Sequence, residues 1–239
     1  MPEATCTRCG AALPTDARFC PNCGTPTPLE GGEERKIVTV LFADLADSTS
    51  LASHLDPERF REILSAFYEL ATNELASLRG RAEKFVGDAV MALFGIPLAH
   101  EDDALRAVRA GFRIREGTAR LGKSLGLSEV LDVRVGVNSG PVAAGPGAAG
   151  EPLVSGAVVN LAARLQQAAE PGEILVGETT WQLTRDAVEF GPERHIDAKG
   201  FDGVVSTRSV LSLSPRSTRR TIPLVGRKRE LDLLTKTYT

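Results

Sequence analysis

The sequence has no long apolar run and no cysteine beyond residue 23. A membrane-spanning helix needs ~20 consecutive apolar residues, so the sequence predicts no transmembrane segment. The N-terminus, MPEATCTRCG, also lacks the basic start and the apolar core of a secretory signal. We therefore expect a cytoplasmic protein.

The chain has no excess of positive charge either. Its formal net charge is -3, and basic residues gather only near the end, between Arg216 and Arg229. This balance argues against a protein whose main partner is a nucleic acid. Hydrophobic residues make up 42% and charged residues 25% of the 239 positions, which is typical of one or two globular domains.

All four cysteines lie in two C-x-x-C pairs, each followed by a glycine. The first pair is Cys6 and Cys9, and the second is Cys20 and Cys23. This spacing fits a tetrahedral Zn²⁺ site, and four thiolates would fill it, so we expect the zinc to be structural. A segment of about 25 residues has too small a core to fold without such help. Paired disulfides and a redox motif are the alternatives.

Composition divides the chain into four segments. We expect a zinc ribbon at residues 1–26, a linker rich in Pro, Gly and Glu at 27–34, and a folded domain at 35–213. Residues 214–239 are basic and rich in Ser and Thr, and they end within an expected helix. We therefore expect the chain to be a fragment of a longer protein.

Hydrophobic periodicity predicts alternating strands and helices in the folded domain. Strands are expected at 36–42, 84–86, 89–94, 130–137, 173–176 and 204–213, and helices at 56–79, 101–123 and 158–169. Gly80 should stop the first helix, and Asn138-Ser139-Gly140 should end the fourth strand. Residues 142–150 should form a flexible loop. The order predicts an α+β fold of the ferredoxin-like kind, an antiparallel sheet with helices packed on it.

Two carboxylates fall where predicted strands end. Asp44 follows a buried strand, and Asp88 lies in a two-residue Gly87-Asp88 turn. In a ferredoxin-like sheet the first strand neighbours the central hairpin, so the two side chains would face each other and bind Mg²⁺ together with substrate phosphates. Alone, each aspartate is better explained as a cap or turn residue. Asn160 and Arg164 are one helical turn apart and share a helix face.

Five sequence blocks together resemble the catalytic domain of class III nucleotide cyclases. They are VTVLFADLADST, EKFVGDAVMALFG, HEDDALRAV, VRVGVNSG and VVNLAARL, in the family's order. The resemblance covers about residues 35–213 and implies a head-to-tail homodimer with active sites at its interface. It implies two-metal conversion of a nucleoside triphosphate to a 3′,5′-cyclic nucleotide and pyrophosphate. The terminal PLVGRKREL resembles the start of an ATPase domain, which would be a regulatory partner absent from this chain.

The resemblance also implies a role for each matching residue. Asp44, Asp88 and the carbonyl of Leu45 would bind two Mg²⁺ or Mn²⁺ ions. The backbone of Ser48 and Thr49 and the side chains of Arg134 and Lys199 would contact the phosphates of the substrate. Lys84 would contact the purine in the partner's site. Asn160 would contact the ribose, and Arg164 the α-phosphate.

Three positions depart from the family pattern. Leu153 stands where a purine-selecting polar residue is usual, Ala157 where an aspartate is usual, and Asp47 where the phosphate loop usually has glycine. Lys84 favours adenine, because an ammonium donates to a ring nitrogen, so we expect ATP as the substrate. The departures leave two alternatives: a guanylate cyclase, and a nucleotide-binding or dimerisation module with little activity. The acidic balance disfavours a third, a zinc-ribbon nucleic-acid binder.

Overall fold

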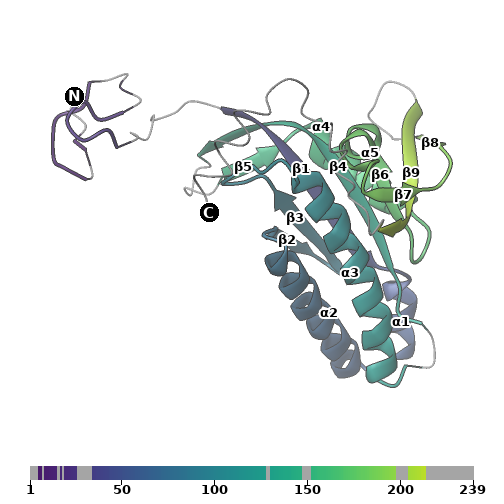
Figure 1. Ribbon diagram of the computed structural model, residues 1–239. Coiled ribbons are helices and arrows are strands. Elements are labelled where there is room, and N and C mark those ends of the chain that lie inside the picture. Colours follow the sequence, from purple (N-terminus) through teal and green to yellow (C-terminus); the bar gives the residue numbers. More distant parts are fainter. Residues whose placement is uncertain are drawn as a thin grey trace, which may run out of the picture.

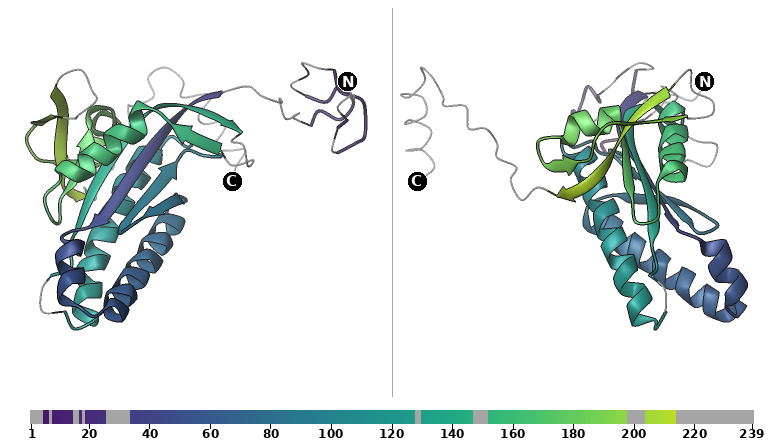
Figure 2. Two further views of the ribbon diagram at one scale, coloured as in Figure 1. Left: turned by 180° about the vertical axis from the view of Figure 1, so that it is seen from behind. Right: turned by 90° about the vertical axis from the view of Figure 1, so that its right-hand side faces the viewer.

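The computed structural model describes residues 5–25 except 7, 15, 16 and 18, and then residues 34–127, 130–146, 152–197 and 204–213. Within these ranges a nine-stranded sheet has the order β2-β3-β1-β4-β6-β9-β7, with β5 paired to β4 and β8 paired to β9. Helices α2 and α3 lie side by side on one face of this sheet, and α4 lies on the other (Figure 1, Figure 2).

The elements follow the chain as β1 (Glu34–Leu45), α1 (Ser48–His54), α2 (Pro57–Ser77), β2 (Arg81–Val86), β3 (Ala89–Phe94), α3 (Asp103–Ser124), β4 (Val133–Pro146), β5 (Pro152–Ser155), α4 (Ala157–Ala168), β6 (Ile174–Gly177), α5 (Glu178–Thr184), β7 (Val188–Phe190), β8 (Arg194–Asp197) and β9 (Val204–Leu213). The antiparallel β2-β3-β1-β4 core with α2 and α3 is the predicted ferredoxin-like α+β fold. None of the described helices is long and apolar enough to cross a membrane.

Strand β1 lies inside the sheet, between β3 and β4, and its side chains alternate between two cores. Leu41 and Ala43 pack with α2 and α3 in the larger core. Val40 and Phe42 pack with α4 in the smaller core. The same alternation places Asp44 on the face that carries α4.

The first long helix ends earlier than predicted, and Gly80 has a different role. Helix α2 ends at Ser77, and the left-handed conformation falls on Arg79, with a φ of 59°. The N–H of Gly80 donates to the carbonyl of Leu75 at 2.8 Å. A Cβ on Gly80 would lie 2.4 Å from the ring of Phe94. Glycine is therefore required for the close approach to β3, and not for a positive φ.

The prediction that Asn138-Ser139-Gly140 ends a strand is wrong, because β4 continues to Pro146. These polar residues lie inside the sheet with their hydrogen bonds made. The amide of Asn138 donates to the carbonyl of Val158 at 3.2 Å, and the hydroxyls of Ser139 and Thr39 lie 2.8 Å apart. Buried polar groups are tolerated when they are bonded in this way. The bonding partners come from β1 and α4, so the local sequence did not reveal them.

The segment predicted as a loop at 142–150 is strand as far as Pro146, where it pairs with β5. Residues 147–150 lie outside the described part of the chain. Five elements were not predicted, namely α1, β5, α5, β7 and β8, and each has seven residues or fewer. Segments this short often show too few periods for a hydrophobic pattern to identify them, although the four-residue β6 was predicted from its apolar run.

Candidate active site

The two aspartates predicted to bind metal lie together at the ends of neighbouring strands. Asp44 pairs with Ala89, the first residue of β3, and Asp88 belongs to the tight turn just before it. The N–H of Leu45 lies 3.5 Å from the carbonyl of Asp88. Burial and the neighbouring Asp88 carboxylate raise the pKa of Asp44 to about 6. A pair of neighbouring carboxylates, in which Asp88 disfavours the charge of Asp44, is a suitable donor set for a hard divalent cation such as Mg²⁺ or Mn²⁺.

Two further side chains act on Asp44, Arg134 through its charge and Gln166 through a hydrogen bond. Arg134 lies directly opposite it on β4, and its charge favours the ionised carboxylate. Gln166, on α4, donates from its amide nitrogen to Asp44 Oδ2 at 3.0 Å. The sequence analysis did not identify Gln166. It lies 122 positions from Asp44 in the chain, and no local pattern marks it.

We expect the affinity for divalent metal to rise as the pH rises through about 6, because Asp44 must lose its proton to bind a cation. The raised pKa of Asp44 also makes the stability of the metal-free protein depend on pH, in the opposite direction to the metal affinity. Between the ordinary value of 3.8 and about 6 the folded chain holds more protons than the unfolded chain, so its stability falls as the pH rises. Mn²⁺ titrations from about pH 5 to about pH 8, and thermal unfolding in EDTA from about pH 4 to about pH 7, would measure the two trends. A Mn²⁺ affinity that stays constant over this range would contradict the prediction.

Lys84 lies on the same sheet face as Asp44. Its neighbour Phe85 packs against Tyr68 of α2, with ring centroids 4.8 Å apart. Successive strand residues point to opposite faces, so Lys84 is directed to the α4 side. Its partner across the hairpin, Met91, belongs to the α4-side core. Lys84 is exposed there, at the edge of the sheet.

Asn160 and Arg164 lie on the face of α4 that is directed away from Asp44. Each helical residue advances by about 100°, so Arg164 is rotated by about 200° from Gln166, and Asn160 shares the face of Arg164. Arg164 Nη1 donates to Gln167 Oε1 at 2.7 Å. Among the residues described, no hydrogen bond or ion pair joins Asn160 or Arg164 to either aspartate. Within one chain the two residue sets therefore lie on different faces of α4.

An ion pair joins the loop between β1 and α1 to β4. Asp47 has a φ of 55°, and its Oδ1 lies 3.1 Å from Arg134 Nη2. Glycine is usual here in the family that the sequence resembles, and the left-handed conformation explains that preference. The arginine predicted to contact phosphates is therefore held by an acidic side chain in this chain.

The remaining predicted residues occupy varied positions. Ser48 and Thr49 are the first two residues of α1, where backbone N–H groups have no intrahelical acceptor. Leu45 is buried at the end of β1. Leu153 lies on β5 opposite Gly145. Lys199 falls outside the described residues, as does the PLVGRKREL segment.

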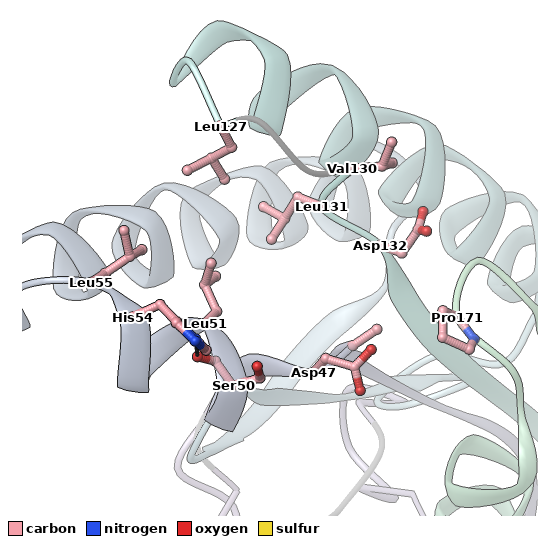
Figure 3. Close-up of a pocket in the computed structure, with 11 residues that line it drawn as sticks. Asp47, Ser50, Leu51, His54, Leu55, Leu127, Val130, Leu131, Asp132 and Pro171 are labelled. Atoms are coloured by element: carbon pink, nitrogen blue, oxygen red, sulfur yellow. Dashed lines mark hydrogen bonds between the residues drawn. The ribbon is translucent and has the colours of Figure 1, made fainter.

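A pocket of about 420 Å³ lies beside this site, between α1 and the connection from α3 to β4. Figure 3 shows Leu51 and Leu131 from these two segments, with Asp47 and Asp132 at one end. None of the side chains predicted to bind metal or nucleotide lines it. This pocket is therefore distinct from the candidate site at Asp44 and Asp88.

The four cysteines form a separate cluster near the N-terminus. Sγ atoms of Cys6 and Cys23 lie 3.6 Å apart, as do those of Cys9 and Cys20, and all four fall within 4.8 Å of one another. A disulfide would bring two sulfurs to about 2.05 Å. Thiolates about 2.3 Å from a shared zinc would lie about 3.8 Å apart, which agrees with the observed spacing.

Local hydrogen bonds favour the thiolate form of two of these cysteines, Cys6 and Cys23, whereas the pKa of Cys9 is raised to about 11 by the neighbouring Cys23 thiol despite the Ala11 N–H. The backbone N–H groups of Arg8 and Cys9 lower the pKa of Cys6. The Thr25 hydroxyl, 3.2 Å from Cys23 Sγ, is the largest cause that lowers the pKa of Cys23 to about 6. Thiolates are the form that binds Zn²⁺, so these contacts favour binding at neutral pH.

We expect chelation of zinc to unfold residues 5–25 and to leave the sheet domain folded. The described part of the ribbon has almost no apolar core of its own, whereas the described part of the sheet domain has three clusters of buried apolar side chains. Zinc content and two-dimensional NMR spectra, recorded before and after treatment with a chelator, would test this. A loss of sheet-domain signals together with the zinc would contradict the prediction.

Comparison with known families agrees with both parts of this description. The profile of the adenylate and guanylate cyclase catalytic domain matches residues 32–210, and that of a zinc-ribbon domain matches residues 5–27. The chain therefore belongs to the adenylate and guanylate cyclase catalytic domain family and carries a zinc ribbon before that domain.

Two uncharacterised bacterial proteins are similar to most of this chain. The chain is 37% identical over 174 residues to an uncharacterised protein of Rhizobium meliloti (strain 1021), covering 71% of this chain and 17% of that protein. It is 31% identical over 196 residues to an uncharacterised protein of Mycobacterium tuberculosis (strain ATCC 25618 / H37Rv), covering 77% of this chain and 34% of that protein. The matched part of the chain thus spans 17% and 34% of the length of these two relatives.

Solved structures include cyclases of both nucleotide specificities. The adenylyl cyclase CyaB from P. aeruginosa is 31% identical with a TM-score of 0.72, covering 77% of this chain and 98% of that chain. The guanylyl cyclase Cya2 is 28% identical with a TM-score of 0.72, covering 78% of this chain and 98% of that chain. The family and the fold therefore do not separate ATP from GTP.

Proposed function

We propose that this chain is an adenylate cyclase that converts ATP to 3′,5′-cyclic AMP and pyrophosphate at the interface of a head-to-tail homodimer. The observation that carries the proposal is the Asp44 and Asp88 pair, with Arg134 opposite Asp44. The exposed Lys84 on the same sheet face supports it. Asn160 and Arg164, on the face of α4 directed away from Asp44, would contribute to the active site of a second copy.

Each active site would contain residues from both chains. Asp44 and Asp88 would hold divalent cations, which when bound supply positive charge at the ribose 3′-hydroxyl and at the pyrophosphate. Arg134 of the same chain would bind the triphosphate. Arg164 of the partner subunit would lie at the α-phosphate, where a preorganised cation stabilises the charge that develops in the transition state. No protein nucleophile is needed.

The choice of adenine depends on one side chain. Lys84 of the partner subunit would donate to a ring nitrogen of adenine, and Asn160 of the partner subunit would orient the ribose. Leu153 offers no side-chain hydrogen bond to the base, so only its backbone would contribute. Discrimination between ATP and GTP would then be weaker than in a site with two polar contacts to the base.

Product analysis tests the proposal directly. Purified protein would be incubated with Mn²⁺ and either ATP or GTP, with metal-free reactions as blanks, and the products separated by chromatography. Cyclic AMP is the expected product. Cyclic GMP alone would refute adenylate specificity and support the guanylate cyclase alternative. Nucleotide binding without product would support a regulatory or dimerisation module, for which the ion pair between Asp47 and Arg134 is the main structural argument.

We expect Asp47→Gly to lower the KM for the nucleotide about 1.4- to fivefold, since an exposed ion pair that competes with phosphate is worth about 0.2–1 kcal/mol. Glycine adopts the left-handed conformation of this position without strain, so the fold should be retained. Asp47→Ala would separate the effect of charge from that of the backbone. Steady-state kinetics at several salt concentrations would measure the change. An unchanged KM in both variants would show that Asp47 does not compete with the substrate.

A further inference from the structure

Gln166 is the residue outside the predicted set that contacts the metal aspartates most directly. It lies near the C-terminal end of α4 and is 7% exposed. Its Nε2 is 3.0 Å from Asp44 Oδ2. A carboxylate accepts hydrogen bonds and an amide nitrogen donates them, so the pairing fixes which end of the glutamine side chain meets Asp44.

The backbone of α4 is held firmly at this position. A Cβ on Gly136 of β4 would lie 2.3 Å from both the backbone nitrogen of Gln166 and the carbonyl oxygen of Ala162. The helix therefore rests directly on the strand, with no side chain between them. Gln166 reaches Asp44 from a backbone position that the sheet itself defines.

We propose that Gln166 is a positioning residue, whose amide holds one oxygen of Asp44 so that the carboxylate meets the metal in a fixed orientation. The inference rests on the proposed function, in which Asp44 binds a divalent cation. Ligating carboxylates are commonly oriented by a hydrogen bond from a neighbouring group, and losing such a bond typically costs about 10–100-fold in metal affinity.

The same contact has a consequence for the dimer. Gln166 faces Asp44 of its own chain, while Asn160 and Arg164 face the opposite way on the same helix. In the proposed homodimer these two residues serve the site that contains the partner's aspartates. Gln166 therefore connects the metal half of one active site to the helix that completes the other.

The test is Mn²⁺ binding to the full chain without nucleotide, measured by electron paramagnetic resonance. Gln166→Met keeps the length of the side chain and removes the amide donor. We expect it to weaken Mn²⁺ binding about tenfold or more, with the midpoint of thermal unfolding in EDTA changed little. Gln182→Met is the matched control, because Gln182 is exposed on α5 and bonds only to Glu178 among the described residues. Its Mn²⁺ affinity should equal that of the wild type.

Two outcomes are informative beyond this comparison. Unchanged Mn²⁺ affinity in a folded Gln166→Met protein would overturn the inference. If that variant does not fold, Gln166→Asn retains a polar amide on a side chain about 1.5 Å shorter, too short to reach Asp44, and should show the same weakening. Binding is measured without turnover, so a failure of the proposed function would appear separately, as bound Mn²⁺ and no cyclic product.

Discussion

Asp44→Asn is expected to lower the rate of cyclic nucleotide formation at least about a hundredfold, because it removes one of two carboxylates that would hold the catalytic cations. Asparagine is close to aspartate in size, and its carbonyl oxygen still accepts the hydrogen bond from Gln166. The loss would therefore come from the charge, with the packing of β1 preserved. Product assays across a range of Mn²⁺ concentrations would measure it.

The same substitution should not destabilise the metal-free protein. The pKa of Asp44 is raised to about 6, which means that the folded state disfavours its charge at neutral pH. Asparagine removes that charge, so the thermal midpoint in EDTA at about pH 7 should stay the same or rise. Asp186→Asn, at an exposed position after α5, is the control and should keep full activity. A normal rate of cyclic nucleotide formation by Asp44→Asn would show that Asp44 is not part of the active site.

Two inactive variants are expected to restore activity when they form a heterodimer. Asp44→Asn damages the metal half of a site, and Arg164→Ala damages the half that α4 provides. Asp44 lies against the face of α4 that carries Gln166, whereas Arg164 lies on the opposite face of that helix. Each active site should therefore take the two residues from different chains. A heterodimer of the two variants would then contain one intact site of two, and about half of the wild-type activity should return.

Co-expression with two different affinity tags would yield the heterodimer for this assay. The matched control pairs Asp44→Asn with Asp88→Asn, because both residues belong to the same half-site and every site would then lack one of them. No activity should return in the control. Recovery in both pairs, or in neither, would contradict the division of the active site between two chains.

Much of the fold could be predicted from the sequence, because the long helices, the tight turn and the cysteine pairs produce patterns among residues that are close together in the chain. The long helices α2 and α3 show several turns of apolar periodicity, and the Gly87-Asp88 turn is a two-residue signal between two strands. The C-x-x-C pairs likewise predicted a four-cysteine cluster, which the structure shows. The short elements α1, β5, α5, β7 and β8 lacked enough residues to produce such patterns.

The sequence by itself determined the residue types of the candidate site and the topology that brings Asp44 near Asp88. Only the tertiary structure decided how these residues are supported and which face each one occupies. The bond from Gln166 to Asp44 joins residues 122 positions apart. Ser139 continues β4 because Thr39 lies beside it, and Gly80 is required because Phe94 approaches it. Each of these features depends on contact between distant segments, and the packing of the folded chain alone creates that contact.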